Sequence, residues 1–241
     1  MSEFESKREN RVKLYGVLIG VFSALFQHVF YVFGNAAAQL IGITPVLTKI
    51  PAIDNAIPII PIFIIPYAWA YIFWAMAPMA VSKCKFDHFL DYLAAYLFAC
   101  IAGMLILIFF PTYMSRVAEG LFDLPRTGIL YRLMNFWYMH DGGAMAYNLF
   151  PSFHCLNSTI SYLGVAGRDE VPKWFRVYSF IVMILVFLAT VFVKQHYVVD
   201  IFGGVAVALI SFYLCEKFRA GRIFLPLIRF FKKLFGKERS K

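Results

Sequence analysis

Two histidines and one aspartate attract attention first, because they are ionisable residues in strongly apolar surroundings. His196 and Asp200 are four residues apart, so on a helix they share one face and lie one turn from each other. The carboxylate can then accept a hydrogen bond from one imidazole nitrogen and leave the other free to act as a base or nucleophile. Taken alone, the pair is equally compatible with a buried structural ion pair.

A second histidine favours the catalytic interpretation. His154 follows Pro151, Ser152 and Phe153 at a point where an apolar segment begins. Proline suits the first turn of a helix, and the free N–H groups and positive dipole end of a helix start attract anions. Phosphoryl transfer needs a nucleophile, a proton donor and positive groups around the phosphate oxygens. We therefore predict a phosphate site at this helix start.

The composition is typical of a membrane protein. The 241 residues are 61% hydrophobic and only 15% charged, whereas soluble domains contain about 25% charged residues. The chain shows no linker, so we expect a single domain over 1–241. The four cysteines are isolated, and we predict no metal site, cofactor or disulfide framework. The polar N-terminus does not resemble a cleavable signal. The net charge of +9 suits cytoplasmic loops rather than nucleic-acid binding.

We predict an all-α fold, a polytopic membrane bundle with six transmembrane helices. A helix needs roughly 20 apolar residues to cross the hydrocarbon. Six stretches approach this length: about 12–33, 57–81, 89–110, 148–166, 174–193 and 197–216. The last two are separated by the polar break at 194–196.

The distribution of basic residues predicts the orientation. Eighteen of the 23 Lys and Arg residues lie in the two tails and in the loops after the second and fourth spans, including a basic tail at about 217–241. Positive charge accumulates on the cytoplasmic side, so both termini are expected there. The loop at about 111–147 and the three ionisable residues then lie on the extracytoplasmic face. We expect a multi-pass cell-membrane protein, with a bacterial plasma membrane favoured and an internal eukaryotic membrane left open.

These motifs resemble the type 2 phosphatidic acid phosphatase superfamily of membrane lipid phosphatases. The second signature of that family, Pro-Ser-Gly-His, is similar to the segment from Pro151 to His154, and its third ends in His-x-x-x-Asp, as at His196 and Asp200. The flanking KQHYVVDIFGG looks more like the branch that includes inositol-phosphotransfer enzymes. The first signature ends in Arg-Pro, and its nearest match is Arg116.

The chain also departs from the family pattern. Phe109 stands where the first signature has a lysine, and Val117 replaces its proline. Ala189 and Thr190 stand where the third signature has Ser-Arg, so two phosphate-binding cations are missing. Lys194 lies four residues after Thr190 and would replace the arginine if the helix continued.

The resemblance implies the role of each residue. His196 would form a phosphohistidine and be oriented by Asp200, while His154 would protonate the leaving oxygen. Arg116, Lys194 and groups near Ser152 and Phe153 would bind the phosphate without a metal.

Three functions remain open on this basis. The leading one is a phosphatase of lipid phosphates or polyprenyl pyrophosphates, with the bilayer and its lipids as partners. The others are a phosphotransferase between lipids and a non-catalytic lipid-binding membrane protein. For two further residues we expect roles outside catalysis. His28 is expected to be a packed helix-interface residue, and Asp141 a polar loop residue that could shape headgroup access.

Overall fold

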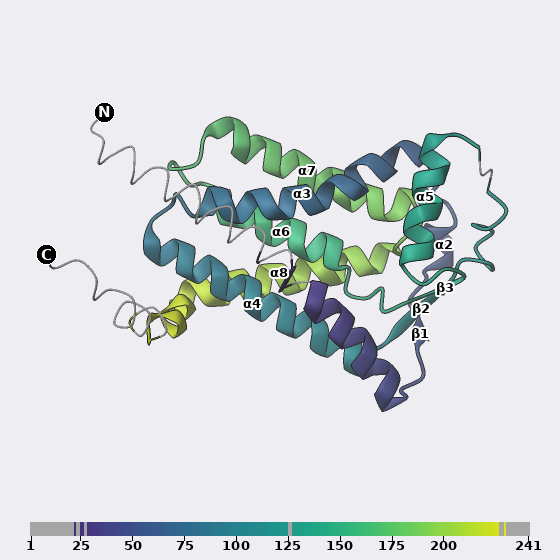
Figure 1. Ribbon diagram of the computed structural model, residues 1–241, viewed down its shortest axis with the longest axis horizontal. Coiled ribbons are helices and arrows are strands. Elements are labelled where there is room, and N and C mark those ends of the chain that lie inside the picture. The colour runs from purple at the N-terminus through teal and green to yellow at the C-terminus, as the bar shows by residue number, and fades with distance from the viewer. Residues whose placement is uncertain (1–21, 23–24, 27, 125–126, 227–228, 230–241) are drawn as a thin grey trace, which may run out of the picture.

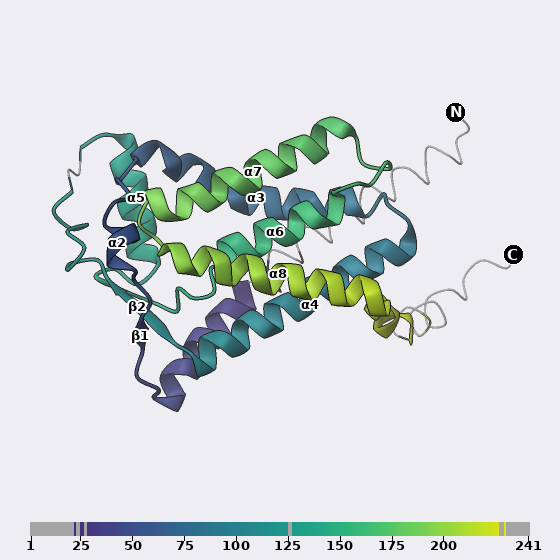
Figure 2. The same cartoon turned by 180° about the vertical axis from the view of Figure 1, so that it is seen from behind.

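The structure, a computed structural model, is mostly helical and describes residues 22, 25–26, 28–124, 127–226 and 229. Residues 28–41 form a helix, and the long helices that follow are α3 (Ile64–Val81), α4 (Phe86–Phe109), α7 (Lys173–Phe192) and α8 (Val198–Phe218). The shorter α6 (Phe153–Val165) runs among them and packs against α3, α4, α7 and α8. These helices lie side by side as a bundle (Figures 1 and 2).

Smaller elements cover one end of the bundle (Figure 1). They are β1 (Val46–Leu47), α2 (Pro51–Asp54), β2 (Thr112–Ser115), α5 (Ile129–His140) and β3 (Met145–Tyr147). Two 3-10 turns complete the described elements: η1 (Pro61–Phe63), which leads into α3, and η2 (Ala220–Phe224), which follows α8.

Four helical segments are long and apolar enough to cross a membrane: Pro61–Val81, Phe86–Phe109, Lys173–Phe192 and Val198–Phe218. They coincide with four of the six predicted spans. The first predicted span, 12–33, lies largely outside the described residues. The fourth, 148–166, contains only the 13 residues of α6, about 20 Å of helix. This is shorter than the roughly 30 Å of hydrocarbon that a spanning helix must cross.

The position of α6 accounts for its polar composition. Its first nine residues are all buried, and they include Asn157, Ser158, Thr159 and Ser161. Because α6 is enclosed by the other helices, it needs no lipid-facing apolar side. Hydropathy alone therefore predicted a helix in this segment, but the predicted helix was longer than α6.

The all-α prediction missed a small sheet at the covered end. Its strand order is β1-β2-β3, with β1 parallel to β2 and β2 antiparallel to β3. Strands of two to four residues are too short to show the period-2 pattern by which strands are recognised. This sheet fixes the segment around β1 against the loop that carries Arg116.

Two glycines allow α8 to approach the start of α6 closely. A Cβ on Gly204 would lie 2.4 Å from the carbonyl oxygen of Ser152, and one on Gly203 would lie 2.3 Å from the ring of Phe150. Neither distance is tolerable for a real side chain. The Gly203-Gly204 pair therefore sets the spacing that brings the first turns of α6 and α8 together, in agreement with the small-residue packing expected in lipid.

Candidate active site

The turn between α7 and α8 places His196. Helix α7 ends at Phe192, and the N–H groups of Gln195 and His196 both donate to the carbonyl oxygen of Thr190, at 2.9 and 3.0 Å. Lys194 adopts a positive φ of 52° inside this turn. The chain reverses within a few residues, so His196 stands immediately before α8 and Asp200 lies in its first turn.

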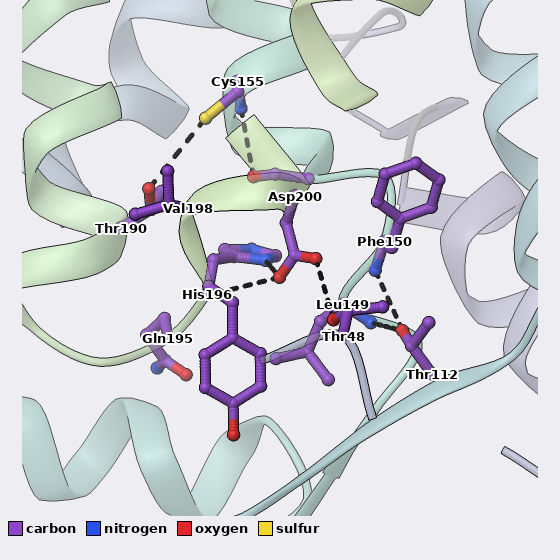
Figure 3. Close-up of polar contacts among 12 residues, drawn as sticks. Thr48, Thr112, Leu149, Phe150, Cys155, Thr190, Gln195, His196, Val198 and Asp200 are labelled. Carbon is purple, nitrogen blue, oxygen red and sulfur yellow. Dashed lines mark hydrogen bonds and ion pairs between the residues drawn. The ribbon is translucent and has the colours of Figure 1, made fainter. Parts of the chain in front are cut away.

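Asp200 is fully buried, and its carboxylate accepts three hydrogen bonds. His196 Nδ1 lies 3.3 Å from Oδ2, and the Tyr197 N–H donates to the same oxygen at 2.9 Å. The hydroxyl of Thr48, just after β1, donates to Oδ1 at 3.2 Å. Figure 3 shows the carboxylate between His196 and Thr48. With Nδ1 engaged in this way, Nε2 of His196 is the nitrogen available for chemistry.

His154 is held by aromatic rings from α3. The Tyr67 ring stacks on the imidazole with centroids 4.1 Å apart, and Trp74 and Tyr71 meet it edge-on at 5.1 and 5.6 Å. These contacts leave the imidazole little freedom to rotate. Its centroid lies 6.1 Å from that of His196. One phosphoryl group can bridge a separation of this size.

Both histidines line the same cavity of about 210 Å³. Its wall also includes Arg116, Asp141 and Gln195 from the covered end of the bundle. The rest of the wall is largely aromatic, with Tyr31, Tyr67, Tyr71, Trp74 and Phe153. A narrow site with a few convergent polar groups and aromatic walls is typical of small-ligand binding.

Arg116 supplies a fixed positive charge to this cavity. It is fully buried, and its guanidinium donates to the carbonyl oxygens of Tyr138, Asp141 and Gly143 and to Gln195 Oε1. Within the described residues it forms no salt bridge, and its Nε has no partner. Burial lowers its pKa, although the nearby Asp141 opposes that shift. A buried cation without a carboxylate partner favours binding of an anion.

Asp141, which we expected to be a polar loop residue that could shape headgroup access, lines the cavity. Its Oδ2 accepts hydrogen bonds from Gln195 Nε2 at 3.1 Å and from the Tyr67 hydroxyl at 3.4 Å. Burial raises the pKa of this carboxyl, while Arg116, His140 and His196 pull it down. The carboxyl therefore keeps its proton to higher pH than a free aspartate.

Ser152 and Phe153 contribute in different ways. Ser152 caps α6: its Oγ accepts the Cys155 N–H at 3.3 Å, and its own N–H donates to the backbone oxygen of Asp200 at 3.0 Å. That N–H is therefore engaged in joining α6 to α8 and is not directed at a ligand. Phe153 lines the cavity with His154. The first turn of α6 therefore connects α6 to α8 and also forms part of the cavity wall.

Lys194 is not brought together with the histidines. Because α7 stops at Phe192, the continued helix on which its predicted position depended does not exist. Its ammonium instead donates to the backbone oxygen of Asp54 at 2.8 Å, and Lys194 is not among the residues that line the cavity. Among the described Lys and Arg residues, Arg116 is the one that lines the cavity together with both histidines.

Two contributors had no recognisable signal in the sequence. Thr48 lies 152 positions from the carboxylate to which it donates, in a short polar segment without a motif. The aromatic residues around His154 are spaced as in any apolar helix.

No group of three or more His, Cys, Asp or Glu side chains in the described part of the chain is arranged to hold a metal ion.

Comparison with known proteins is informative at the level of the family. Residues 38–214 match a family model described as the PAP2 superfamily. The matched region includes Arg116, His154, His196 and Asp200. Searches of curated proteins and of solved structures found no match.

Proposed function

The chain belongs to the PAP2 superfamily, and from this membership and the geometry of the cavity we propose that it hydrolyses lipid phosphates or polyprenyl pyrophosphates. The membership and the four apolar helices support a phosphatase of membrane lipids. The observation that carries the more specific proposal is that His154, His196 and Arg116 line one cavity while Asp200 fixes His196.

The first step is attack by His196. Its Nε2 forms a bond to phosphorus while the bond between phosphorus and the leaving oxygen breaks. Asp200 accepts the Nδ1–H hydrogen bond and stabilises the positive charge that develops on the ring. His154 donates a proton to the leaving oxygen, and the guanidinium of Arg116 stabilises charge on the phosphoryl oxygens.

The second step releases phosphate. The now neutral His154 takes a proton from a water molecule, whose oxygen attacks phosphorus as the bond to His196 Nε2 breaks. Inorganic phosphate leaves, and both histidines return to their starting states. An alcohol in place of water would give phosphotransfer, so the second candidate function shares the first step. In this mechanism the protein's own groups perform every role, and no added metal is required.

The positions of basic residues support a site on the extracytoplasmic face. The loops and helix ends far from the cavity carry Lys83, Lys85, Arg168, Lys173, Arg176, Lys217, Arg219 and Arg222. The described basic residues at the cavity end are Lys49, Arg116, Arg132 and Lys194. By the positive-inside rule, the cavity end faces away from the cytoplasm and the bundle spans the membrane with both termini inside.

Phosphate release by the purified protein tests the proposal. In detergent and with a chelator present, the wild type should release phosphate from phosphatidate or a polyprenyl pyrophosphate. His196→Ala should lower the rate by at least about 1,000-fold, because it removes the nucleophile. His140→Ala, a histidine outside the cavity, is the matched control. Full activity in His196→Ala would overturn the mechanism. With an alcohol acceptor added, the phosphate ester of that alcohol as the only product would favour phosphotransfer.

A further inference from the structure

A buried polar group lies deeper in the cavity than the proposed chemistry requires. Asn157 is 1% exposed and lines the cavity, and its Oδ1 has no hydrogen-bond partner among the described residues. A buried amide oxygen without a hydrogen-bond donor destabilises the folded protein. A ligand that donates a hydrogen bond to this oxygen would remove that destabilisation.

The position of Asn157 relates it to the phosphate site. It follows His154 by three residues on α6, so both side chains lie on the same side of the helix, about one turn apart. Since α6 begins at the covered end of the bundle, Asn157 lies further inside than His154 (Figure 1). A lipid whose phosphate sits between the histidines would extend past this amide.

A second polar residue borders the same region. His28, from the helix at 28–41, also lines the cavity and so is not simply packed between helices. Trp74 lies at this depth too, where its indole N–H donates to Ser158, the residue after Asn157, at 2.9 Å. The cavity therefore also contains an amide and a further imidazole beside its aromatic wall.

These groups define the chemistry of their ligand. The Asn157 oxygen requires a hydrogen-bond donor, which ester carbonyls and hydrocarbon cannot provide. A hydroxyl can donate to that oxygen and also accept a hydrogen bond from a neighbouring group. The short distance from the histidines places this hydroxyl close to the phosphate ester.

We propose that Asn157 forms a specificity subsite that selects lipid phosphates with a free hydroxyl near the phosphate group. This inference builds on the proposed function for the position of the phosphate, but it concerns binding rather than catalysis. It predicts discrimination between two lipids that differ only in that hydroxyl.

Equilibrium binding of two matched probes tests the subsite. The probes are a 1-acyl-glycerol 3-phosphate and its analogue with hydrogen in place of the 2-hydroxyl, each titrated against the full chain in detergent. The wild type should bind the hydroxylated probe about threefold to tenfold more tightly, as expected for one buried hydrogen bond. Asn157→Leu should bind both probes equally, because leucine has similar size but no amide.

Asn135→Leu, on α5 and outside the cavity, is the matched control and should keep the wild-type ratio. If Asn157→Leu does not fold, the smaller Asn157→Ala replaces it. Equal binding of both probes by the wild type, or an unchanged ratio in the Asn157 variant, overturns the proposal. Phosphate release is measured separately. Selective binding without phosphate release would support the subsite and contradict the phosphatase. Phosphate release without selective binding would support the phosphatase and contradict the subsite.

Discussion

At the scale of single residues, the carboxylate of Asp200 fixes the geometry of the site. Its two oxygens accept hydrogen bonds from an imidazole, a backbone N–H and a hydroxyl. A buried carboxylate held in this way has one orientation, and it imposes that orientation on His196. The donor that comes from outside this turn is Thr48.

We predict that Thr48→Val lowers kcat by about tenfold, because Asp200 loses a donor and holds His196 less firmly. Thr48→Ser keeps the hydroxyl and should restore most of the activity. A role in positioning also predicts an altered pH dependence of kcat with little change in KM. Thr44→Val, at an exposed position in the same segment, is the control. Equal losses in the Ser and Val variants would contradict this role.

Asp141 gives a pH-dependent prediction. Burial raises its pKa, so the folded protein holds this proton to higher pH than the unfolded chain, whose aspartate pKa is about 3.9. The associated stability is present below that value and is lost as pH rises through the folded-state pKa. The wild type should therefore lose stability relative to Asp141→Asn as pH increases above about 4.

Thermal unfolding across a pH series measures this difference, with Asp123→Asn, an exposed aspartate, as the control. A wild type that becomes more stable relative to Asp141→Asn as pH rises would show that the carboxyl is not destabilised by burial.

The sequence predicted some residues of the site and not others, for physical reasons. The His196–Asp200 contact was predicted from helical spacing, and the structure has it at 3.3 Å, although His196 lies before α8 and reaches Asp200 across the start of that helix. His154 belongs to a recognisable helix start. Thr48 could not be identified, and Asp141 was expected only to shape headgroup access, because the contacts of both residues depend on how distant loops fold over the bundle. No local pattern contains that information.

At the scale of elements, the contact between α6 and α8 brings the two histidines together. Gly204 permits it, since an added Cβ would lie 2.4 Å from the Ser152 carbonyl oxygen and 3.0 Å from the Leu156 nitrogen. Both neighbours are backbone atoms, which cannot rotate away. The separation of His154 and His196 therefore depends on this glycine.

We predict that Gly204→Ala destabilises the protein by about 1–3 kcal/mol and lowers activity by more than tenfold in the molecules that remain folded. Ala206→Val adds bulk on the exposed side of the same helix and should have little effect on either quantity. Thermal unfolding and phosphate release, measured on the same preparations, separate the two effects. Normal activity and stability in Gly204→Ala would show that the helices can move apart without consequence.

Two predictions about the helices and strands were wrong: the position of Lys194 and the absence of a sheet. The prediction for Lys194 assumed that α7 continued, but the turn that presents His196 requires α7 to end before it. Hydropathy predicted the polar break at 194–196, but it could not show that the turn directs Lys194 to the backbone oxygen of Asp54. The three short strands were missed because pairing, not composition, defines them.

At the scale of the whole molecule, apolar composition predicts much of the architecture. Four of the predicted spans coincide with helices that are long and apolar enough to cross a membrane, because lipid requires apolar side chains over that length. The buried α6 does not follow this rule, since it is surrounded by protein. Where a helix packs inside a bundle is a tertiary property that its own hydropathy does not encode.

The orientation in the membrane is a prediction at this scale. All four native cysteines are buried, so an added surface cysteine can be labelled selectively. With a membrane-impermeant maleimide, Arg132→Cys at the cavity end should react in intact cells. Lys173→Cys at the opposite end should react only after permeabilisation. The reverse pattern would place the site on the cytoplasmic face.

Trapping the covalent intermediate tests the central claim most directly. Purified protein is mixed with a lipid phosphate labelled in its phosphoryl group, quenched within milliseconds to seconds, and assayed for protein-bound label that survives alkali but is released by acid. We expect such label on His196 in the wild type and none in His196→Ala, as the proposed mechanism requires. Rapid phosphate release by the wild type with no label at this residue, or equal label in His196→Ala, would contradict it.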